Sequence, residues 1–285
     1  MGKFDGILLV SDIDATLFNS QHRISEENKK AIEYFKSEGG KFTVASGRMR
    51  DAVGNYFDEF RINAPAILHN GAVLYDFDTN TVIYKKTIEP ERKQAILRVA
   101  QDHPEFGIEI YSDERVYILQ ECFETERFKT KNYDVTYGMP DEIWDRPWTK
   151  ALVGGTEEEL DEFEPIFRSD YDSGYSARSG KYYLDIVAND VSKGYGVKCL
   201  AQFLNINRDN IYAVGDNMND YEMIKYAGNG FAVENAVNEL KKIAKKVVPS
   251  NDDSAIAYII NELIMYKGRL YDIYNSGFAS AVRHR

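Results

Sequence analysis

Two aspartates one residue apart, Asp12 and Asp14, follow the apolar run 7–10 and Ser11 near the N-terminus. Two carboxylates this close repel each other unless a cation or a proton is shared between them. Mg²⁺ suits such a place because it prefers one or two carboxylates together with substrate phosphate oxygens. An Asp-x-Asp pair is a short motif, and it is equally compatible with the start of an ordinary polar loop. The pair alone therefore leaves both interpretations open.

The predicted secondary structure around Asp12 and Asp14 favours a cation site over an ordinary polar loop. The run 7–10 is short and apolar throughout, which is typical of a central strand in a parallel sheet, buried on both faces. In open α/β sheets, ligands bind beyond the carboxyl ends of the strands. Polar residues also follow three other predicted strands, at 46–47, 70–71 and 216–220.

Lys193 adds a cation to this set, because it opens a predicted helix near the same edge of the sheet. Phosphoryl transfer needs carboxylates that hold a metal, and it needs a lysine with hydroxyl or backbone donors that neutralise the phosphoryl oxygens. A nucleophile must also lie in line with the leaving group. The predicted strand ends and Lys193 together supply these groups.

The order of the predicted elements indicates a core that is interrupted by a second module. Strands and helices alternate up to residue 68, as in a parallel sheet with right-handed crossovers, and a hairpin at 72–77 and 81–86 follows. Antiparallel strands with a few helices then indicate an α+β module. We predict an α/β, doubly wound parallel-sheet core of residues 1–86 and 190–285, with an inserted α+β cap domain of residues 87–189.

Individual elements are predicted from hydrophobic periodicity and from start and stop signals. The helix 26–37, for example, has Ser25 as its N-cap and Gly39-Gly40 as its stop. The predicted helices are 26–37, 51–60, 89–101, 156–167, 192–204 and 238–246. The predicted strands are 7–10, 41–45, 66–68, 72–77, 81–86, 106–111, 116–120, 150–153, 182–187, 211–214 and 231–233.

Composition narrows the classes of function. The net charge of −11 argues against a nucleic-acid or anionic-membrane partner, which would require a basic patch. No run approaches the roughly 18 apolar residues of a membrane span, and the N-terminus lacks a signal-peptide pattern. Cys122 and Cys199 form neither a disulfide framework nor a metal-ligand spacing. We expect a cytoplasmic protein that is a monomer or a small homo-oligomer.

Each motif residue also has a structural interpretation. Asp216 and Asp220 could be acids near a helix N-terminus that the helix dipole stabilises. Lys193 could be a solvated lysine at a helix start, a position that the dipole mildly disfavours for a cation. Ser46 could be an N-cap, alone or in addition to a role in binding phosphate. Arg48 and Asn70 are as compatible with structural roles as with functional ones.

Four motifs in this order resemble those of the haloacid dehalogenase superfamily, at 12–16, 46–48, 193–194 and 215–220. The Cof-type phosphatases are the most similar subclass, since they also have Asn-Gly-Ala after the third strand, matched here at 70–72. These enzymes carry a large α/β cap inserted after that motif. The resemblance covers about residues 6–263, and it implies a Rossmann-like core, an α/β cap and phosphatase activity.

The resemblance also implies roles for single residues. Asp12 would be the nucleophile that forms an aspartyl-phosphate, and Asp14 would protonate the leaving group and then activate water. Thr16 would orient Asp14 or its loop. Mg²⁺ would be held by Asp12, by the backbone carbonyl of Asp14, by Asp216 and by Asp220, the last directly or through water. Phosphate would be bound by Ser46, Gly47, Lys193 and Asn219, and Arg48 and Asn70 are further candidates.

The expected function is that of a Mg²⁺-dependent phosphatase acting on a small phosphorylated metabolite, with a sugar phosphate ahead of a nucleotide or cofactor phosphate. A phosphomutase that returns the phosphoryl group to another hydroxyl is one alternative. A non-catalytic sensor of a phosphometabolite is another. The sequence departs from the family at Ala15, where glycine is usual, and alanine is tolerated there unless the backbone needs a positive φ.

Overall fold

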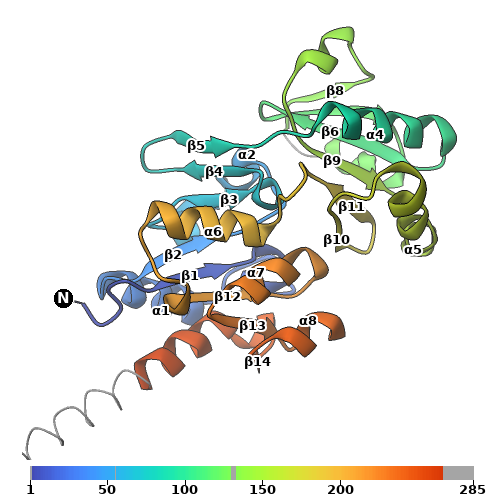
Figure 1. Cartoon of the computed structure of the whole chain (residues 1–285). Helices are drawn as coiled ribbons and strands as arrows, with labels where there is room; N and C mark the ends of the chain where they lie inside the picture. The colour runs from blue at the N-terminus through green and yellow to red at the C-terminus, as the bar shows by residue number, and fades with distance from the viewer. Residues whose placement is uncertain (1, 55, 130–132, 266–285) are drawn as a thin grey trace, which may run out of the picture.

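The chain folds into a parallel-sheet core and a separate mixed-sheet insert (Figure 1). The structure is a computed structural model that describes residues 2–54, 56–129 and 133–265. The architecture confirms the predicted α/β class with an inserted module. The core sheet contains, in spatial order, β14 (Lys246–Val248), β13 (Asn229–Val233), β12 (Ile211–Gly215), β1 (Leu8–Ser11) and β2 (Lys41–Val44).

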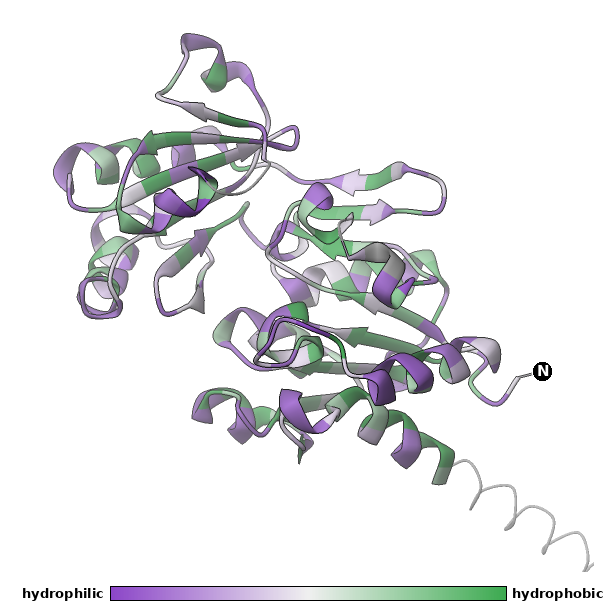
Figure 2. Cartoon of the chain, turned by 180° about the vertical axis from the view of Figure 1, so that it is seen from behind, coloured by the Kyte–Doolittle hydropathy of each residue, from purple (hydrophilic) through white to green (hydrophobic). Residues whose placement is uncertain are grey.

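Strand β1 lies at the centre of the core, as its apolar run predicts. It pairs in parallel with β12 on one side and β2 on the other, and all four of its residues are buried. Figure 2 shows mainly hydrophobic residues along the strands of this sheet. A short antiparallel sheet continues the core through β3 (Ala66–Leu68), β4 (Val73–Asp76) and β5 (Thr81–Lys85).

Helices cover the core sheet. The N-cap prediction for the first of them is confirmed, since the Ser25 hydroxyl accepts a hydrogen bond from the backbone N–H of Asn28 at 3.1 Å. None of the helices over the described residues combines the length and the apolar content that a bilayer crossing requires. The core helices are α1 (Glu26–Ser37), α2 (Arg50–Gly54), α3 (Phe57–Phe60), α6 (Lys193–Phe203), α7 (Tyr221–Tyr226), α8 (Asn238–Ile243) and a helix over residues 255–265.

The insert is built on a six-stranded sheet with its own apolar core around Trp148 and Phe163. Its strands, in spatial order, are β10 (Ser176–Gly180), β11 (Tyr183–Ile186), β9 (Trp148–Gly154), β6 (Gly107–Ser112), β7 (Arg115–Gln120) and β8 (Val135–Tyr137). The pair β7–β8 is parallel and the other pairs are antiparallel. Its helices are α4 (Pro90–Asp102) and α5 (Glu157–Ile166).

Each module has its own main hydrophobic core, and a smaller buried cluster joins Met49 and Ala52 of the core to insert residues such as Leu152. The main core cluster draws its buried residues from positions 4–75 and 197–263, and the insert cluster draws its own from positions 88–186. The boundaries that we propose, after residues 86 and 189, fall between these clusters.

Some predicted elements differ from the structure. The predicted helix 238–246 ends at Ile243, because Ala244 is extended and the backbone N–H of Lys245 donates to the Gly230 carbonyl at 2.8 Å. Lys246 therefore begins strand β14, which pairs with β13. The predicted helix 51–60 is two short helices, α2 and α3. The sequence analysis missed β8, β10, β14, α7 and the helix 255–265.

The turn after β1 has a positive φ at Ala15, the position where the sequence departs from the family. This turn, Ile13–Leu17, is irregular, and Ala15 lies in the left-handed region with φ +55° and ψ 14°. The Ala15 carbonyl accepts a hydrogen bond from the Asn235 side chain at 2.8 Å, which fixes the turn to a distant loop. A Cβ in this region costs roughly 1–2 kcal/mol, so alanine is strained at the position where the family uses glycine.

The turn after β3 is also left-handed, at His69 (φ +49°), Asn70 (φ +53°) and Gly71 (φ +100°). The start of α6 packs against it so closely that a Cβ on Gly71 would lie 2.0 Å from the Ser192 carbonyl oxygen. Gly71 thus allows the N-terminus of α6, which carries Lys193, to reach the carboxyl edge of the sheet.

We expect Ala15→Gly to stabilise the protein. Relief of the left-handed strain outweighs the extra chain entropy of glycine, for a net gain of about 0.5–1 kcal/mol in the free energy of unfolding. Urea unfolding monitored by circular dichroism measures this gain. Unchanged or lower stability of the variant would contradict the strained conformation.

We expect Gly71→Ala to destabilise the core by about 2–4 kcal/mol, since it adds a steric clash to the left-handed strain. Gly6→Ala is the matched control, because Gly6 has φ +75° but nothing within 4 Å of an added Cβ. The control loses only about 1 kcal/mol for the strain. Equal losses in the two variants, measured by urea unfolding, would show that the contact with α6 is not tight.

Candidate active site

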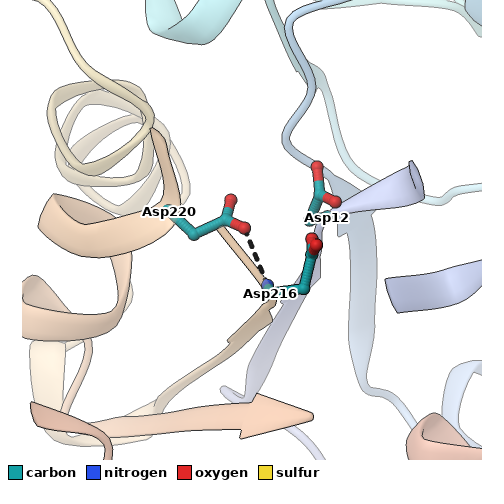
Figure 3. A group of neighbouring side chains, drawn as sticks. All are labelled: Asp12, Asp216 and Asp220. Atoms are coloured by element: carbon teal, nitrogen blue, oxygen red, sulfur yellow. Dashed lines mark hydrogen bonds between the residues drawn. The ribbon is translucent and has the colours of Figure 1, made fainter. Parts of the chain in front are cut away.

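Three carboxylates converge at the carboxyl edge of the core sheet (Figure 3). Asp12 follows β1 and Asp216 follows the neighbouring strand β12, so parallel pairing brings them side by side. Asp220 ends the short helical turn Met218–Asp220, and its side chain points toward the other two aspartates. Its Oδ2 accepts hydrogen bonds from the backbone N–H groups of Asp216 at 2.9 Å and Asn217 at 3.2 Å. One carboxylate oxygen from each of the three aspartates lies within 4.8 Å of the others.

Lys193 reaches into this group from the first residue of α6. Its side chain is 1% exposed, and its Nζ lies 2.5 Å from Asp12 Oδ1 and 2.7 Å from Asp220 Oδ1. The interpretation of Lys193 as a solvated lysine at a helix start is therefore wrong. A buried ammonium needs such partners, because isolated charges are very unfavourable away from water.

Burial and mutual repulsion raise the pKa of Asp12 and of Asp216. The pKa of Asp12 lies well above its usual range, chiefly because it is buried and also because Asp220 and Asp216 repel its charge, although Lys193 opposes the shift. Burial and Asp220 raise the pKa of Asp216 to about 7. Burial alone would lower the pKa of Lys193, but Asp12 and Asp220 outweigh it and raise that pKa. The site therefore holds more negative charge than its lysine compensates.

The three carboxylates fit a divalent cation. Mg²⁺ prefers hard oxygen donors and is usually held by one or two carboxylates, waters and substrate phosphate oxygens. When all three acids are ionised, Lys193 neutralises one of their three negative charges, and the remaining two equal the charge of one Mg²⁺. The side chain of Asp14 is not part of this group, and a role of its backbone carbonyl stays a prediction.

The Asp14 side chain instead pairs with Arg48. The Arg48 guanidinium donates two hydrogen bonds to it, from Nε at 2.8 Å and from Nη2 at 2.6 Å, and it lies over the rings of Phe18 and Tyr56. Burial favours the neutral acid, but the hydrogen bonds and charge of Arg48 prevail and lower the pKa of Asp14. The Asp14 side chain is half exposed and lines the cavity described below.

The other predicted residues lie around the carboxylates. Thr16 donates a hydrogen bond to Asp216 Oδ1 at 3.1 Å, so its hydroxyl orients Asp216, and the expected role in orienting Asp14 or its loop stays a prediction. Ser46 is buried, and its Oγ accepts the backbone N–H of Arg48 at 3.2 Å, which is a local turn contact and not a helix cap, since α2 begins only at Arg50. Asn219 donates to Asn70 Oδ1 at 3.2 Å, so these two amides form one buried unit.

A cavity of about 650 Å³ opens between the core and the insert. The sequence pattern predicted no residue of the insert wall as part of the site. Buried charges inside apolar strands, such as Lys150 in Lys-Ala-Leu-Val and Asp185 in Leu-Asp-Ile-Val, were the available signal. The predicted residues on the core wall are Asp12, Asp14, Ser46, Gly47, Arg48, Asp216 and Asn219, and the insert wall includes Tyr111, Arg127, Lys150, Tyr183 and Asp185.

Similar proteins include several phosphatases. Phosphatase YwpJ of Bacillus subtilis is 26% identical over 285 residues, which covers 90% of this chain and 99% of the relative. The 5-amino-6-(5-phospho-D-ribitylamino)uracil phosphatase YwtE of the same organism is 28% identical, covering 89% of this chain and 96% of the relative. The solved structure of the HAD subclass IIB sugar phosphatase BT4131 shares the fold, with a TM-score of 0.78 and 22% identity over 90% of this chain and 98% of that chain.

The family is established by a match over most of the chain. The model for haloacid dehalogenase-like hydrolases matches residues 9–260, from the first core strand to the last described helix. That span includes all four motifs and the insert between them. The resemblance predicted from the motifs is confirmed: the chain belongs to the haloacid dehalogenase-like hydrolases, in their phosphatase branch.

Proposed function

We propose that this protein is a Mg²⁺-dependent phosphatase that hydrolyses a small phosphorylated metabolite through an aspartyl-phosphate. The observation that carries the proposal is the buried pairing of Asp12 and Asp220 with Lys193, beside Asp216 and at the edge of the cavity. Carboxylates, a lysine and a water-excluding cavity are the parts that phosphoryl transfer requires. A cytoplasmic location and a monomer or small homo-oligomer accompany this proposal as predictions.

In the first step, a carboxylate oxygen of Asp12 bonds to phosphorus while the bond from phosphorus to the leaving oxygen breaks. Lys193 holds Oδ1 of Asp12 and so fixes the orientation of the nucleophile. Ser46, Gly47 and Asn219 contact the phosphoryl oxygens. Asp12, Asp216 and Asp220 would hold Mg²⁺, which would supply positive charge against the developing phosphoryl charge.

Asp14 acts as the general acid in the first step and as the general base in the second. It protonates the leaving alkoxide in the first step and takes a proton from the attacking water in the second, which releases Asp12 and inorganic phosphate. The pair with Arg48 favours the ionised form of Asp14, which suits the second step. For the first step Asp14 must hold a proton, so the contact with Arg48 has to open when substrate enters.

The cavity supports a sugar or sugar-alcohol phosphate as substrate. Its volume suits a small ligand, and its insert wall combines the rings of Tyr111 and Tyr183 with charged groups that bind hydroxyls. The relative YwtE acts on a phosphorylated ribityl compound, a substrate of this chemistry. A nucleotide or cofactor phosphate is the next candidate.

We expect Mg²⁺-dependent phosphate release that both Asp12→Asn and Asp14→Asn remove. Loss of the nucleophile leaves no turnover above background, and loss of the acid–base group costs about 10²–10⁴-fold in kcat. A phosphate-release screen over sugar, nucleotide and cofactor phosphates, with and without EDTA, measures this. Asp209→Asn, an exposed core aspartate outside the cavity lining, is the matched control.

Three results would contradict the proposed reaction. Retained turnover in Asp12→Asn would exclude the aspartyl-phosphate. Slow net release that a bisphosphate activates would identify a phosphomutase. Mg²⁺-dependent ligand binding without release on any substrate would identify a sensor.

We expect Mg²⁺ to stabilise the fold more at pH 8 than at pH 5.5. Without metal, the raised pKa of Asp216, about 7 against 3.8 in the unfolded chain, costs stability that is absent below pH 3.8 and complete above pH 7. Mg²⁺ offsets this cost, and protons compete with it as the pH falls. Thermal unfolding midpoints with Mg²⁺ and with EDTA measure the shift. Equal shifts at the two pH values, or a full shift in Asp216→Asn, would refute this site.

A further inference from the structure

Hydrogen bonds and an ion pair cross from the insert to the phosphate-binding side of the site through five residues, which we call the bridge: Asn219, Asn70, Asp185, Lys150 and Gly47. Asn219 Nδ2 donates to Asn70 Oδ1 at 3.2 Å, and Asn70 Nδ2 donates to Asp185 Oδ2 at 2.6 Å. Lys150 Nζ lies 3.4 Å from Asp185 Oδ1 and donates to the Gly47 carbonyl at 3.0 Å. The contacts therefore leave the core at Asn70 and return to it at Gly47.

The two insert residues of the bridge are buried charges with few other partners. Asp185 is 2% exposed and Lys150 is 5% exposed, and both line the cavity. Among the residues that the structure describes, Asp185 Oδ1 finds no hydrogen-bond partner, and Lys150 Nζ lies 4.3 Å from the ring centre of Tyr111. Burying both charges is unfavourable unless they are paired, which explains why they meet each other and the core.

The fit at Gly47 shows how closely the modules approach. A Cβ on Gly47 would lie 3.1 Å from Asn70 Oδ1 and 3.3 Å from Asp185 Oδ2. The loop that carries Ser46 and Gly47 is thus packed under the bridge, and its Gly47 carbonyl is held by Lys150.

We propose that Asp185 is a positioning residue through which the insert completes the phosphate-binding site. Its carboxylate can only accept, so it turns the Asn70 amide with Nδ2 toward itself and Oδ1 toward Asn219. In that orientation Asn70 Oδ1 accepts a hydrogen bond from one N–H of the Asn219 amide. The second N–H of the Asn219 amide is left for a phosphoryl oxygen. This inference rests on the proposed function, in which Asn219 and the loop at Gly47 bind phosphate.

Other polar contacts between the modules lack this property. Lys86 Nζ donates to the Asn189 carbonyl at 3.0 Å, and the Thr149 hydroxyl lies 3.2 Å from His69 Nδ1. None of these residues lines the cavity. The bridge is distinguished by ending on residues that bind phosphate in the proposed mechanism.

The test is Asp185→Asn in the full-length protein, assayed on 4-nitrophenyl phosphate and on the best sugar phosphate. An asparagine amide can present Nδ2 to Asn70 and break the orientation, so kcat/KM falls about 10- to 100-fold on both substrates. Asp172→Asn is the matched control, since Asp172 pairs with the buried Arg92 at 2.6 Å within the insert and outside the cavity lining. It lowers the thermal midpoint without this loss in kcat/KM.

A second variant separates orientation from charge. The exchange Asn70→Asp with Asp185→Asn restores one amide and one carboxylate with their roles reversed, and we expect it to recover most of the lost kcat/KM. A loss confined to the sugar phosphate would overturn the proposal, because Asp185 would then bind substrate hydroxyls that 4-nitrophenyl phosphate lacks. Unchanged kcat/KM on both substrates would also overturn it.

Binding of inorganic phosphate gives a readout that does not depend on turnover. We expect calorimetry in the presence of Mg²⁺ to show about 10-fold weaker phosphate binding in Asp185→Asn than in the unmodified protein or in Asp172→Asn. Equal phosphate affinity in all three proteins would refute the bridge. If the unmodified protein binds phosphate but releases none from any ester, the proposed function fails while this comparison still decides the role of Asp185.

Discussion

The burial of Lys193 between Asp12 and Asp220 is the interaction on which the rest of the site depends. Each partner comes from a different part of the chain, so the contact forms only when β1, β12 and the start of α6 are assembled. Removal of one partner from a buried ion pair costs about 3–5 kcal/mol, because it leaves an unpaired charge. The site and the core of the fold therefore form together, and Gly71 allows α6 to approach closely enough for the contact.

The same interaction explains why the site calls for a cation. One lysine cannot neutralise three carboxylates, and burial with mutual repulsion raises the pKa of Asp12 and Asp216. The side chain of Asp14 lies outside this cluster of excess negative charge and pairs with Arg48. The hydrogen bonds and charge of Arg48 lower the pKa of Asp14. Two carboxylates one residue apart in the sequence thus have opposite electrostatic surroundings, as the proposed nucleophile and the proposed acid–base group require.

The sequence was sufficient to predict the parts of the site that follow from strand order. Parallel strands end at one edge, so the aspartates after β1 and β12 had to lie close together. The insert wall was beyond such reasoning, because the pairing of Tyr111 with Lys150 and of Asp185 with Leu152 depends on the register between strands distant in the sequence. The three-residue strand β14 forms only by pairing with β13, which local periodicity cannot show.

The segment that leads back from the insert to the core carries both Asp185 of the insert wall and Lys193. Strand β11 carries Asp185, and only seven residues later Ser192 caps the helix that begins with Lys193. The tight packing of Ser192 against Gly71 anchors this segment to the core just before Lys193. The lysine is therefore held by the core alone, whereas Asp185 belongs to the insert. The insert therefore contacts Asn70 through Asp185, whereas the ion pairs of Lys193 with Asp12 and Asp220 lie within the core.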